Sequence, residues 1–235
     1  LGFALDRWPV KACVVVPNYS NPLGFLMPDA NKHALVSLLG KHGVTLIEDD
    51  VYGDLGFDHR RPTTCMALAP RADIIHCSSF SKTLAPGLRV GWVAAGKHRE
   101  RIEYLKYVSS IASPTAPQLA VADLLESGRY ERYLRDVRGR YASAVARMGD
   151  AVMKYFPEGT RVSQPLGGFV LWVELPGKID SFELARRALK QGVSIAPGPL
   201  FSASGKFRNF IRLSCARVWD DRLERALVKL AGLVG

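Results

Sequence analysis

The chain has 235 residues, of which 48% are hydrophobic and 23% charged, as in an ordinary globular protein. No apolar run approaches the roughly 20 residues of a membrane-spanning helix, residues 1–10 lack the features of a secretory signal, and the four cysteines fit neither a disulfide framework nor a zinc spacing. We therefore expect a cytoplasmic protein without membrane segments, whose net charge of +10 suits nucleic acid or an anionic cofactor or substrate.

The first half of the chain alternates between apolar runs and a helical pattern. Asp29 is a candidate N-cap for a helix that ends near Lys41, before Gly43. Short runs rich in β-branched residues predict buried strands at 12–16, 44–47, 74–77 and 90–95. Strand, helix and strand at this spacing indicate βαβ units, so we expect an α/β fold with a mostly parallel sheet.

The second half changes character. Helices are expected at 98–110, 117–125, 128–154, 182–191 and 220–233. Strands are expected at 167–175, 193–196 and 209–216. This order predicts a first, α/β domain over residues 1–115 and a second, α+β domain over residues 116–235.

The helix expected at 128–154 begins with a segment rich in arginine, from Gly128 to Tyr141. The arginines are numerous enough to cover more than one helix face. They fit a solvated surface helix with ion pairs, and they also fit an interface with nucleic acid or an acidic domain.

Polar residues follow three of the expected strands. Because parallel strands present their C-terminal ends along one edge of the sheet, these loops can converge. A lysine among hydroxyls, with an arginine seven residues on, can react with a carbonyl while its neighbours hold a phosphate. Taken alone, the lysine loop is as consistent with a surface turn. The candidate residues are Asn21 after the first strand, Asp49 and Tyr52 after the second, and Ser79, Lys82 and Arg89 after the third.

The acidic run Glu48-Asp49-Asp50 closes the second of these strands. Buried carboxylates without partners are costly, so a cation should face at least one of them.

The order of these motifs resembles class I/II aminotransferases of fold type I. The matching motifs are Asn-Pro-x-Gly from Asn21, Asp-x-x-Tyr from Asp49, Ser-x-x-Lys from Ser79 and Arg-x-Gly from Arg89. The resemblance implies pyridoxal 5'-phosphate as the cofactor. Its aldehyde needs an amine, its pyridine nitrogen needs a carboxylate, and its phosphate needs cations and hydroxyls, and each of these has a candidate among the residues above.

The resemblance also assigns roles. Lys82 would form the Schiff base and shuttle the proton, and Asp49 would pair with the pyridine nitrogen. Asp49 is chosen over Asp50 by the three-residue step to Tyr52. Asn21 and Tyr52 would bind the phenolic oxygen of the cofactor.

The remaining roles concern anions. Ser79 and Arg89 would bind the cofactor phosphate. Arg212, in Phe-Ile-Arg-Leu-Ser, matches the family arginine that grips a substrate carboxylate, with Asn21 beside it. The implied ligand is an amino acid or another carboxylate-bearing amine.

Three segments, Pro17–Gly24, Ser78–Trp92 and Gly128–Arg135, resemble more narrowly the aminotransferase-like domain of MocR-type regulators of the GntR family. That resemblance implies an effector-sensing domain, with DNA bound only through an upstream domain. A stand-alone aminotransferase that moves an amino group to a 2-oxo acid uses the same residues, so the site does not discriminate the two.

The family's earlier strands and the helix N-terminus that cradles the phosphate have no counterpart in the sequence. We therefore expect a fragment with an incomplete large domain of the PLP-transferase fold, which by itself binds the cofactor poorly and turns over little. Sites of this kind lie near subunit interfaces, so the intact protein is expected to be a homodimer.

Overall fold

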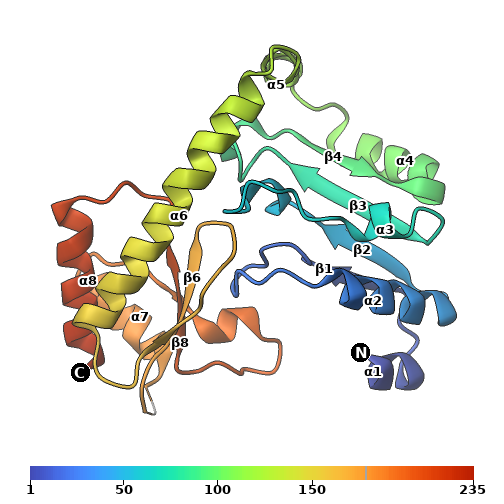
Figure 1. Ribbon diagram of the computed structural model, residues 1–235. Coiled ribbons are helices and arrows are strands. Elements are labelled where there is room, and N and C mark those ends of the chain that lie inside the picture. The colour runs from blue at the N-terminus through green and yellow to red at the C-terminus, as the bar shows by residue number, and fades with distance from the viewer. Residues whose placement is uncertain (178) are drawn as a thin grey trace. The chain divides into compact units, whose positions relative to one another are not determined.

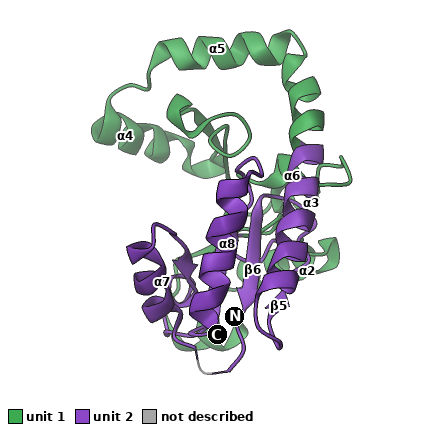
Figure 2. Cartoon of the chain, turned by 90° about the vertical axis from the view of Figure 1, so that its left-hand side faces the viewer, with its two compact units in different colours: residues 1–20, 26–137 green, residues 21–25, 138–235 purple. Residues whose placement is uncertain are grey.

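Two units make up the structure, a computed structural model that describes residues 1–177 and 179–235 (Figures 1 and 2). Unit 1 contains residues 1–20 and 26–137, and unit 2 contains residues 21–25 and 138–235. These units are sets of residues that contact one another, and their boundaries differ from those of the predicted domains 1–115 and 116–235. That division stays a prediction.

A four-stranded sheet forms the centre of unit 1, in the order β1-β2-β3-β4. The first three strands pair in parallel and β4 is antiparallel to β3, which confirms a mostly parallel sheet. Two of the strands run two residues further than expected, so that Asp49 ends β2 and Ser79 ends β3. The strands are β1 (Ala12–Val15), β2 (Thr45–Asp49), β3 (Ile74–Ser79) and β4 (Gly91–Ala94).

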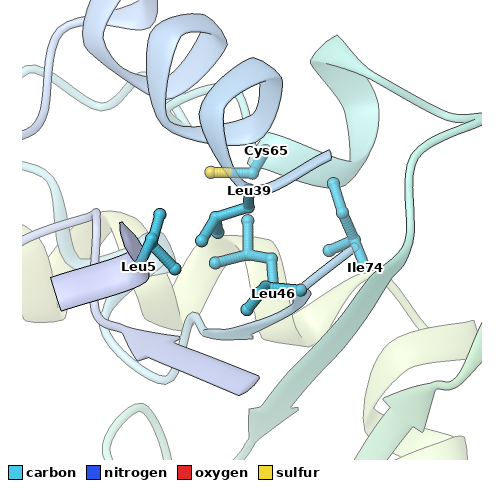
Figure 3. Close-up of a cluster of buried hydrophobic side chains, with 6 residues drawn as sticks. Leu5, Leu39, Leu46, Cys65 and Ile74 are labelled. Atoms are coloured by element: carbon cyan, nitrogen blue, oxygen red, sulfur yellow. The ribbon is translucent and has the colours of Figure 1, made fainter. Parts of the chain in front are cut away.

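One face of this sheet buries the core of unit 1. The helix α2 (Asp29–Lys41) covers the expected residues, but Asp29 is its first helical residue and not the predicted N-cap, which is Pro28. This helix inserts Leu39 between Leu46 of β2 and Cys65, as Figure 3 shows. Each fully buried side chain of this size contributes roughly 1.5–3 kcal/mol. Two short helices were not expected from the sequence, α1 (Gly2–Arg7) and α3 (Cys65–Leu68).

A buried carboxylate explains why α3 forms. Glu48 on β2 accepts hydrogen bonds from the backbone N–H groups of Cys65 at 2.7 Å and Met66 at 3.2 Å, and lies 3.2 Å from Nδ1 of His76. Burial raises the pKa of Glu48, but the contacts with His76 and the two N–H groups outweigh it and leave the pKa lowered. The N-terminus of α3 is thus satisfied by a residue of a distant strand together with its local N-cap Thr64, whose Oγ1 accepts from the N–H of Ala67 at 3.1 Å.

Most of the remaining helices of unit 1 follow the sheet in the chain. The long helices at 99–110, 115–126 and 129–155 begin within two residues of the expected positions, whereas the short 3-10 helices at 53–55, 86–88 and 96–98 were not expected from the sequence. Among the described residues, no helix is long and apolar enough to cross a membrane. The elements are η1 (Gly53–Leu55), η2 (Pro86–Leu88), η3 (Gly96–His98), α4 (Arg99–Ser110), α5 (Thr115–Glu126) and α6 (Arg129–Tyr155), the last of which continues into unit 2.

The arginine-rich segment of α6 presents most of its arginines to solvent. Arg129, Arg132 and Arg135 are exposed, whereas Tyr130 and Leu134 of the same turns are buried. The helix is therefore amphipathic, and its apolar stripe rather than its charge positions it. Arg138 is buried and departs from this pattern.

Unit 2 is an antiparallel sheet with helices, which confirms the α+β character expected of the C-terminal part. The strand order is β5-β6-β8-β7. The expected strand at 193–196 is shorter and ends one residue later, since only Ala196 and Pro197 pair, with Arg212 and Ile211. The elements are β5 (Arg161–Val162), β6 (Val170–Glu174), α7 (Ser181–Lys190), β7 (Ala196–Pro197), η4 (Gly198–Phe201), β8 (Phe210–Ser214) and α8 (Asp221–Val234).

Candidate functional site

The loop after β3 carries the predicted lysine. It folds back on itself, because the N–H groups of Leu84 and Ala85 both donate to the carbonyl of Phe80, at 2.9 and 3.2 Å. Lys82 lies in this turn and is half-buried. In the part of the chain that the structure describes, its amine has no hydrogen bond or ion pair, so it is open to a ligand.

Hydroxyls and a guanidinium flank the lysine. The backbone N–H of Ser81 donates to Ser79 Oγ at 3.3 Å, and Arg89 donates to Ser81 Oγ at 3.4 Å and to the carbonyl of Pro86 at 3.2 Å. Arg89 has φ = 53°, in the left-handed region, and turns the chain into β4. The predicted Ser79, Lys82 and Arg89 therefore lie in one loop, joined by Ser81, a hydroxyl that fits a phosphate-binding group.

A glycine lets β4 approach this loop. Gly91 pairs with Ser79, and a Cβ at this position would lie 2.8 Å from the carbonyl oxygen of Ser78 and 3.0 Å from Ser79 Cβ. A larger residue would push β4 away from the end of β3. The Arg-x-Gly spacing thus has a steric reason.

The end of β2 places a carboxylate at the same edge. Asp49 pairs in register with Cys77, two residues before Ser79, so the ends of β2 and β3 are neighbours. The side chain of Asp49 is half-buried and accepts from the N–H of Val51 at 3.4 Å, and Tyr52 is buried three residues on. Unit 1 therefore brings together Asp49, Tyr52, Ser79, Lys82 and Arg89.

Asp50 has a different environment. Its carboxylate is 1% exposed and accepts from Asn18 Nδ2 at 2.7 Å and from Arg61 at 2.6 Å. Burial raises the pKa of Asp50 and outweighs the Arg61 guanidinium and the Asn18 amide, which lower it. The expected cation is thus Arg61. The carboxylate of Asp50 is thus paired inside unit 1, whereas that of Asp49 is half-buried and accepts only from the N–H of Val51 among the described residues.

In unit 2, the predicted arginine holds a half-buried position. Arg212 on β8 donates to Asn21 Oδ1 at 3.1 Å, and its guanidinium lies 5.3 Å from the ring centre of Phe201. Its Nε is buried and has no hydrogen bond within the described residues. An arginine with an unsatisfied buried donor is suited to a carboxylate ligand, which accepts two parallel N–H bonds.

The structure thus gathers the predicted residues in two groups, five in unit 1 and the Asn21–Arg212 pair in unit 2. No cluster of metal-ligating side chains occurs among the residues that the structure describes. Two features near the site were not among the predicted residues. One is the ion pair between Asp50 and Arg61, and the other is Ser81. The cost of burying the acidic run was the one sequence signal for the first of them.

Comparison with known proteins adds an independent finding. A family model of aminotransferase class I and II matches residues 4–230. The uncharacterized HTH-type transcriptional regulators YjiR and YdcR of Escherichia coli K12 are 40% and 41% identical over the whole chain. The chain spans about half the length of each of these regulators.

Enzymes match as well. The chain is 35% identical to 2-aminoadipate transaminase of Thermus thermophilus, over 98% of this chain and 60% of the enzyme. The crystal structure of LysN, the alpha-aminoadipate aminotransferase from the same species, superposes with a TM-score of 0.91 at 30% identity over 99% of this chain and 60% of that one. The crystal structure of Pyrococcus horikoshii kynurenine aminotransferase superposes with a TM-score of 0.88 at 30% identity, over 96% of this chain and 56% of that one.

Proposed function

Since the chain belongs to the class I and II aminotransferase family, we propose that it is the pyridoxal-phosphate-binding effector domain of a MocR-type transcriptional regulator of the GntR family. The observation that carries this proposal is the unpartnered amine of Lys82 at the end of β3, flanked by Ser79, Ser81 and Arg89 within the described residues. The similarity of the whole chain to the regulators YjiR and YdcR supports the regulatory role.

The residues present fit the cofactor. Pyridoxal phosphate supplies an aldehyde that condenses with amines and a pyridine ring that withdraws electrons. Lys82 supplies the amine and Asp49 the carboxylate for the ring nitrogen. Ser79 and Arg89 supply a hydroxyl and a cation for the phosphate, and Tyr52 a phenol for the ring oxygen.

Each of these side chains has a defined task. Lys82 acts as the nucleophile and afterwards as the base that holds the proton taken from a bound ligand. Asp49, at the strand end, keeps a proton on the ring nitrogen. The buried position of Tyr52 keeps its phenol from moving into solvent. Arg89 is positioned by its bonds to Ser81 and Pro86, so little side-chain freedom is lost when an anion binds.

A trapping experiment tests the cofactor proposal. The protein is incubated with millimolar pyridoxal phosphate, reduced with borohydride and digested, and the pyridoxyl group is located by mass spectrometry. We expect Lys82 to carry most of the label, because its amine is half-buried and unpaired among the described residues. Label spread evenly over the exposed lysines, such as Lys97, would contradict the proposal.

The proposed effector is an amino acid or another carboxylate-bearing amine, bound by Arg212 with Asn21 beside it. We expect Arg212→Ala to weaken its binding roughly 10- to 100-fold, because one charge-assisted hydrogen bond contributes about 1.5–3 kcal/mol. Titration of the intact, cofactor-loaded protein with amino acids, followed by absorbance, measures the loss. Arg208→Ala is the matched control, since Arg208 pairs with Asp180 on the surface. An unchanged affinity in Arg212→Ala would contradict the role of Arg212.

A second candidate is a stand-alone aminotransferase, which the 35% identity to 2-aminoadipate transaminase favours. Both functions need the same lysine, carboxylate and arginines, so the site alone does not decide between them. The higher identity to the two regulators makes the regulatory function the first candidate.

The proposal extends to the assembly of the intact protein. In this proposal a further domain binds DNA and the protein is a homodimer. The exposed apolar side chains of α4 and its C-terminal end support an interface, since Tyr104, Tyr107 and Ile111 are 57%, 64% and 77% exposed. Sedimentation of the intact protein at the mass of one chain would contradict the dimer.

A further inference from the structure

A tyrosine at the start of α6 contacts the lysine loop. Tyr130 is 6% exposed, and its ring lies edge-on against Phe80, with 5.6 Å between the ring centres. Its phenol oxygen lies 3.0 Å from Thr83 Oγ1 and 3.3 Å from Asp54 Oδ2, and hydrogen-bonds to both. A hydroxyl both donates and accepts, so one phenol can serve the two partners at once.

These partners lie on either side of the predicted site. Thr83 is 2% exposed and directly follows Lys82. Asp54 lies in η1, just after Tyr52, and accepts from Arg61 at 2.7 Å. Arg61 in turn binds Asp50, the neighbour of Asp49. The phenol therefore adds a side-chain link between the lysine loop and the turn after β2, beside the hydrogen bond from Ser78 Oγ to the carbonyl of Asp50.

Lys82 itself has no bond that fixes it within the described residues, so the position of its amine depends on its neighbours in the loop. On one side, Ser81 is tied to Ser79 and Arg89. On the other side, Thr83 is tied to Tyr130. We propose that Tyr130 is a positioning residue for Lys82. It acts through Thr83 to hold the amine at the same edge of the sheet as Asp49; this inference rests on the proposed function.

The hydroxyl is the informative part of this residue. The ring contact with Phe80 would be kept by phenylalanine, which fills the same space without burying a polar group. Burial, more than the nearby Asp54 carboxylate, raises the pKa of Tyr130, so the phenol keeps its proton. A purely structural role would require the ring alone, whereas positioning requires the hydroxyl.

The test compares wild type with Tyr130→Phe, Thr83→Val and Thr83→Ser in the intact protein. The first readout is hydrogen–deuterium exchange of the Leu84 and Ala85 amides without cofactor. We expect roughly three- to tenfold faster exchange in Tyr130→Phe and Thr83→Val, because each loses a neutral hydrogen bond. Thr83→Ser retains the hydroxyl and is expected to restore the wild-type rate.

The second readout is the ratio of pyridoxyl label at Lys82 to label at the exposed Lys97 after borohydride reduction. We expect this ratio to fall severalfold in Tyr130→Phe and in Thr83→Val, and to return in Thr83→Ser. The ratio is measured within one molecule, so differences in protein or cofactor concentration do not change it. It is compared under conditions in which circular dichroism shows every variant to be folded, because unfolding alone would also lower it. Tyr133→Phe is the matched control and should leave both readouts unchanged, because it removes a hydroxyl of the same helix that has no hydrogen bond among the described residues.

The two readouts separate the inference from the proposed function. Unchanged exchange and an unchanged labelling ratio in Tyr130→Phe and in Thr83→Val would overturn the positioning role while Lys82 labels normally. If wild type shows no preference for Lys82, the cofactor proposal fails and with it the assignment of Tyr130 to the site. Faster exchange together with a lowered ratio, rescued by Thr83→Ser, supports the inference.

Discussion

Replacement of Lys82 by alanine in the intact protein should abolish covalent attachment of pyridoxal phosphate and, with it, control of transcription by the cofactor. Lys82 is the only lysine between Ser78 and Trp92, and alanine leaves neither a nucleophile nor a base there. The measurement is a reporter driven by a promoter region that the protein binds, with and without pyridoxal phosphate and amino acids. DNA binding itself should persist.

Two further variants sharpen this experiment. Lys82→Arg retains a positive charge near the phosphate group but not a reactive amine, so it should behave as Lys82→Ala does. Lys97→Ala removes an exposed lysine and should behave as wild type. Cofactor-dependent control that survives in Lys82→Ala would refute the regulatory proposal. Transamination measurable in wild type and lost in Lys82→Ala would instead favour the enzyme.

Asp50→Ala should destabilise the protein by about 1–3 kcal/mol, although Asp50 is not expected to touch the cofactor. The substitution leaves the fully buried amide of Asn18 without its partner, and an unsatisfied buried donor costs about that much. Loss of the ion pair with Arg61 adds less to the destabilisation, because the Arg61 side chain is 39% exposed and water can replace the carboxylate. For a chain of this size the unfolding midpoint should fall by roughly 5 °C.

The comparison with Asp50→Asn isolates the charge. Asparagine keeps an acceptor for Asn18 and Arg61, so its cost should be smaller than that of alanine. The pKa of Asp50 is raised in the folded state, so ionisation of the buried carboxylate destabilises the wild type once the pH exceeds the pKa of the unfolded chain. Its stability relative to Asp50→Asn should therefore rise as the pH falls from neutral towards 4. Chemical denaturation at several pH values measures this difference, and a pH-independent difference would contradict the assignment.

The parallel part of the sheet was predictable because its signals are local. The β-branched runs that became β1, β2 and β3 are bounded by prolines, glycines or polar residues, and α2 has both a first-turn Asp29 and a terminating Gly43. The site residues followed from the same feature, since each lies where such a run ends. The comparisons confirm the family, and the assignment of individual residues to roles stays a prediction.

The features that the sequence did not predict depend on contacts between residues far apart in the chain. The four residues of α3 have a local cap in Thr64, but their first N–H group donates to Glu48, seventeen residues earlier. Tyr130 lies in an arginine-rich segment, so the sequence there indicates a charged surface and not the buried apolar face of α6. Its partner Thr83 is 47 residues away. The acidic run predicted a cation beside one of its carboxylates, but not that this cation is Arg61, eleven residues after Asp50. Such long-range polar contacts leave no local pattern.

The five residues 21–25 belong to unit 2, although they lie between two segments of unit 1 in the chain. During synthesis this piece leaves the ribosome long before its hydrogen-bond partner, because Asn21 and Arg212 are 191 positions apart. Unit 2 should therefore complete its folding only after residue 212 has been made, and the contact then closes a loop of high sequence separation. Nor will a single cut after residue 137 yield two autonomous halves, because unit 2 would lose the segment that holds Asn21.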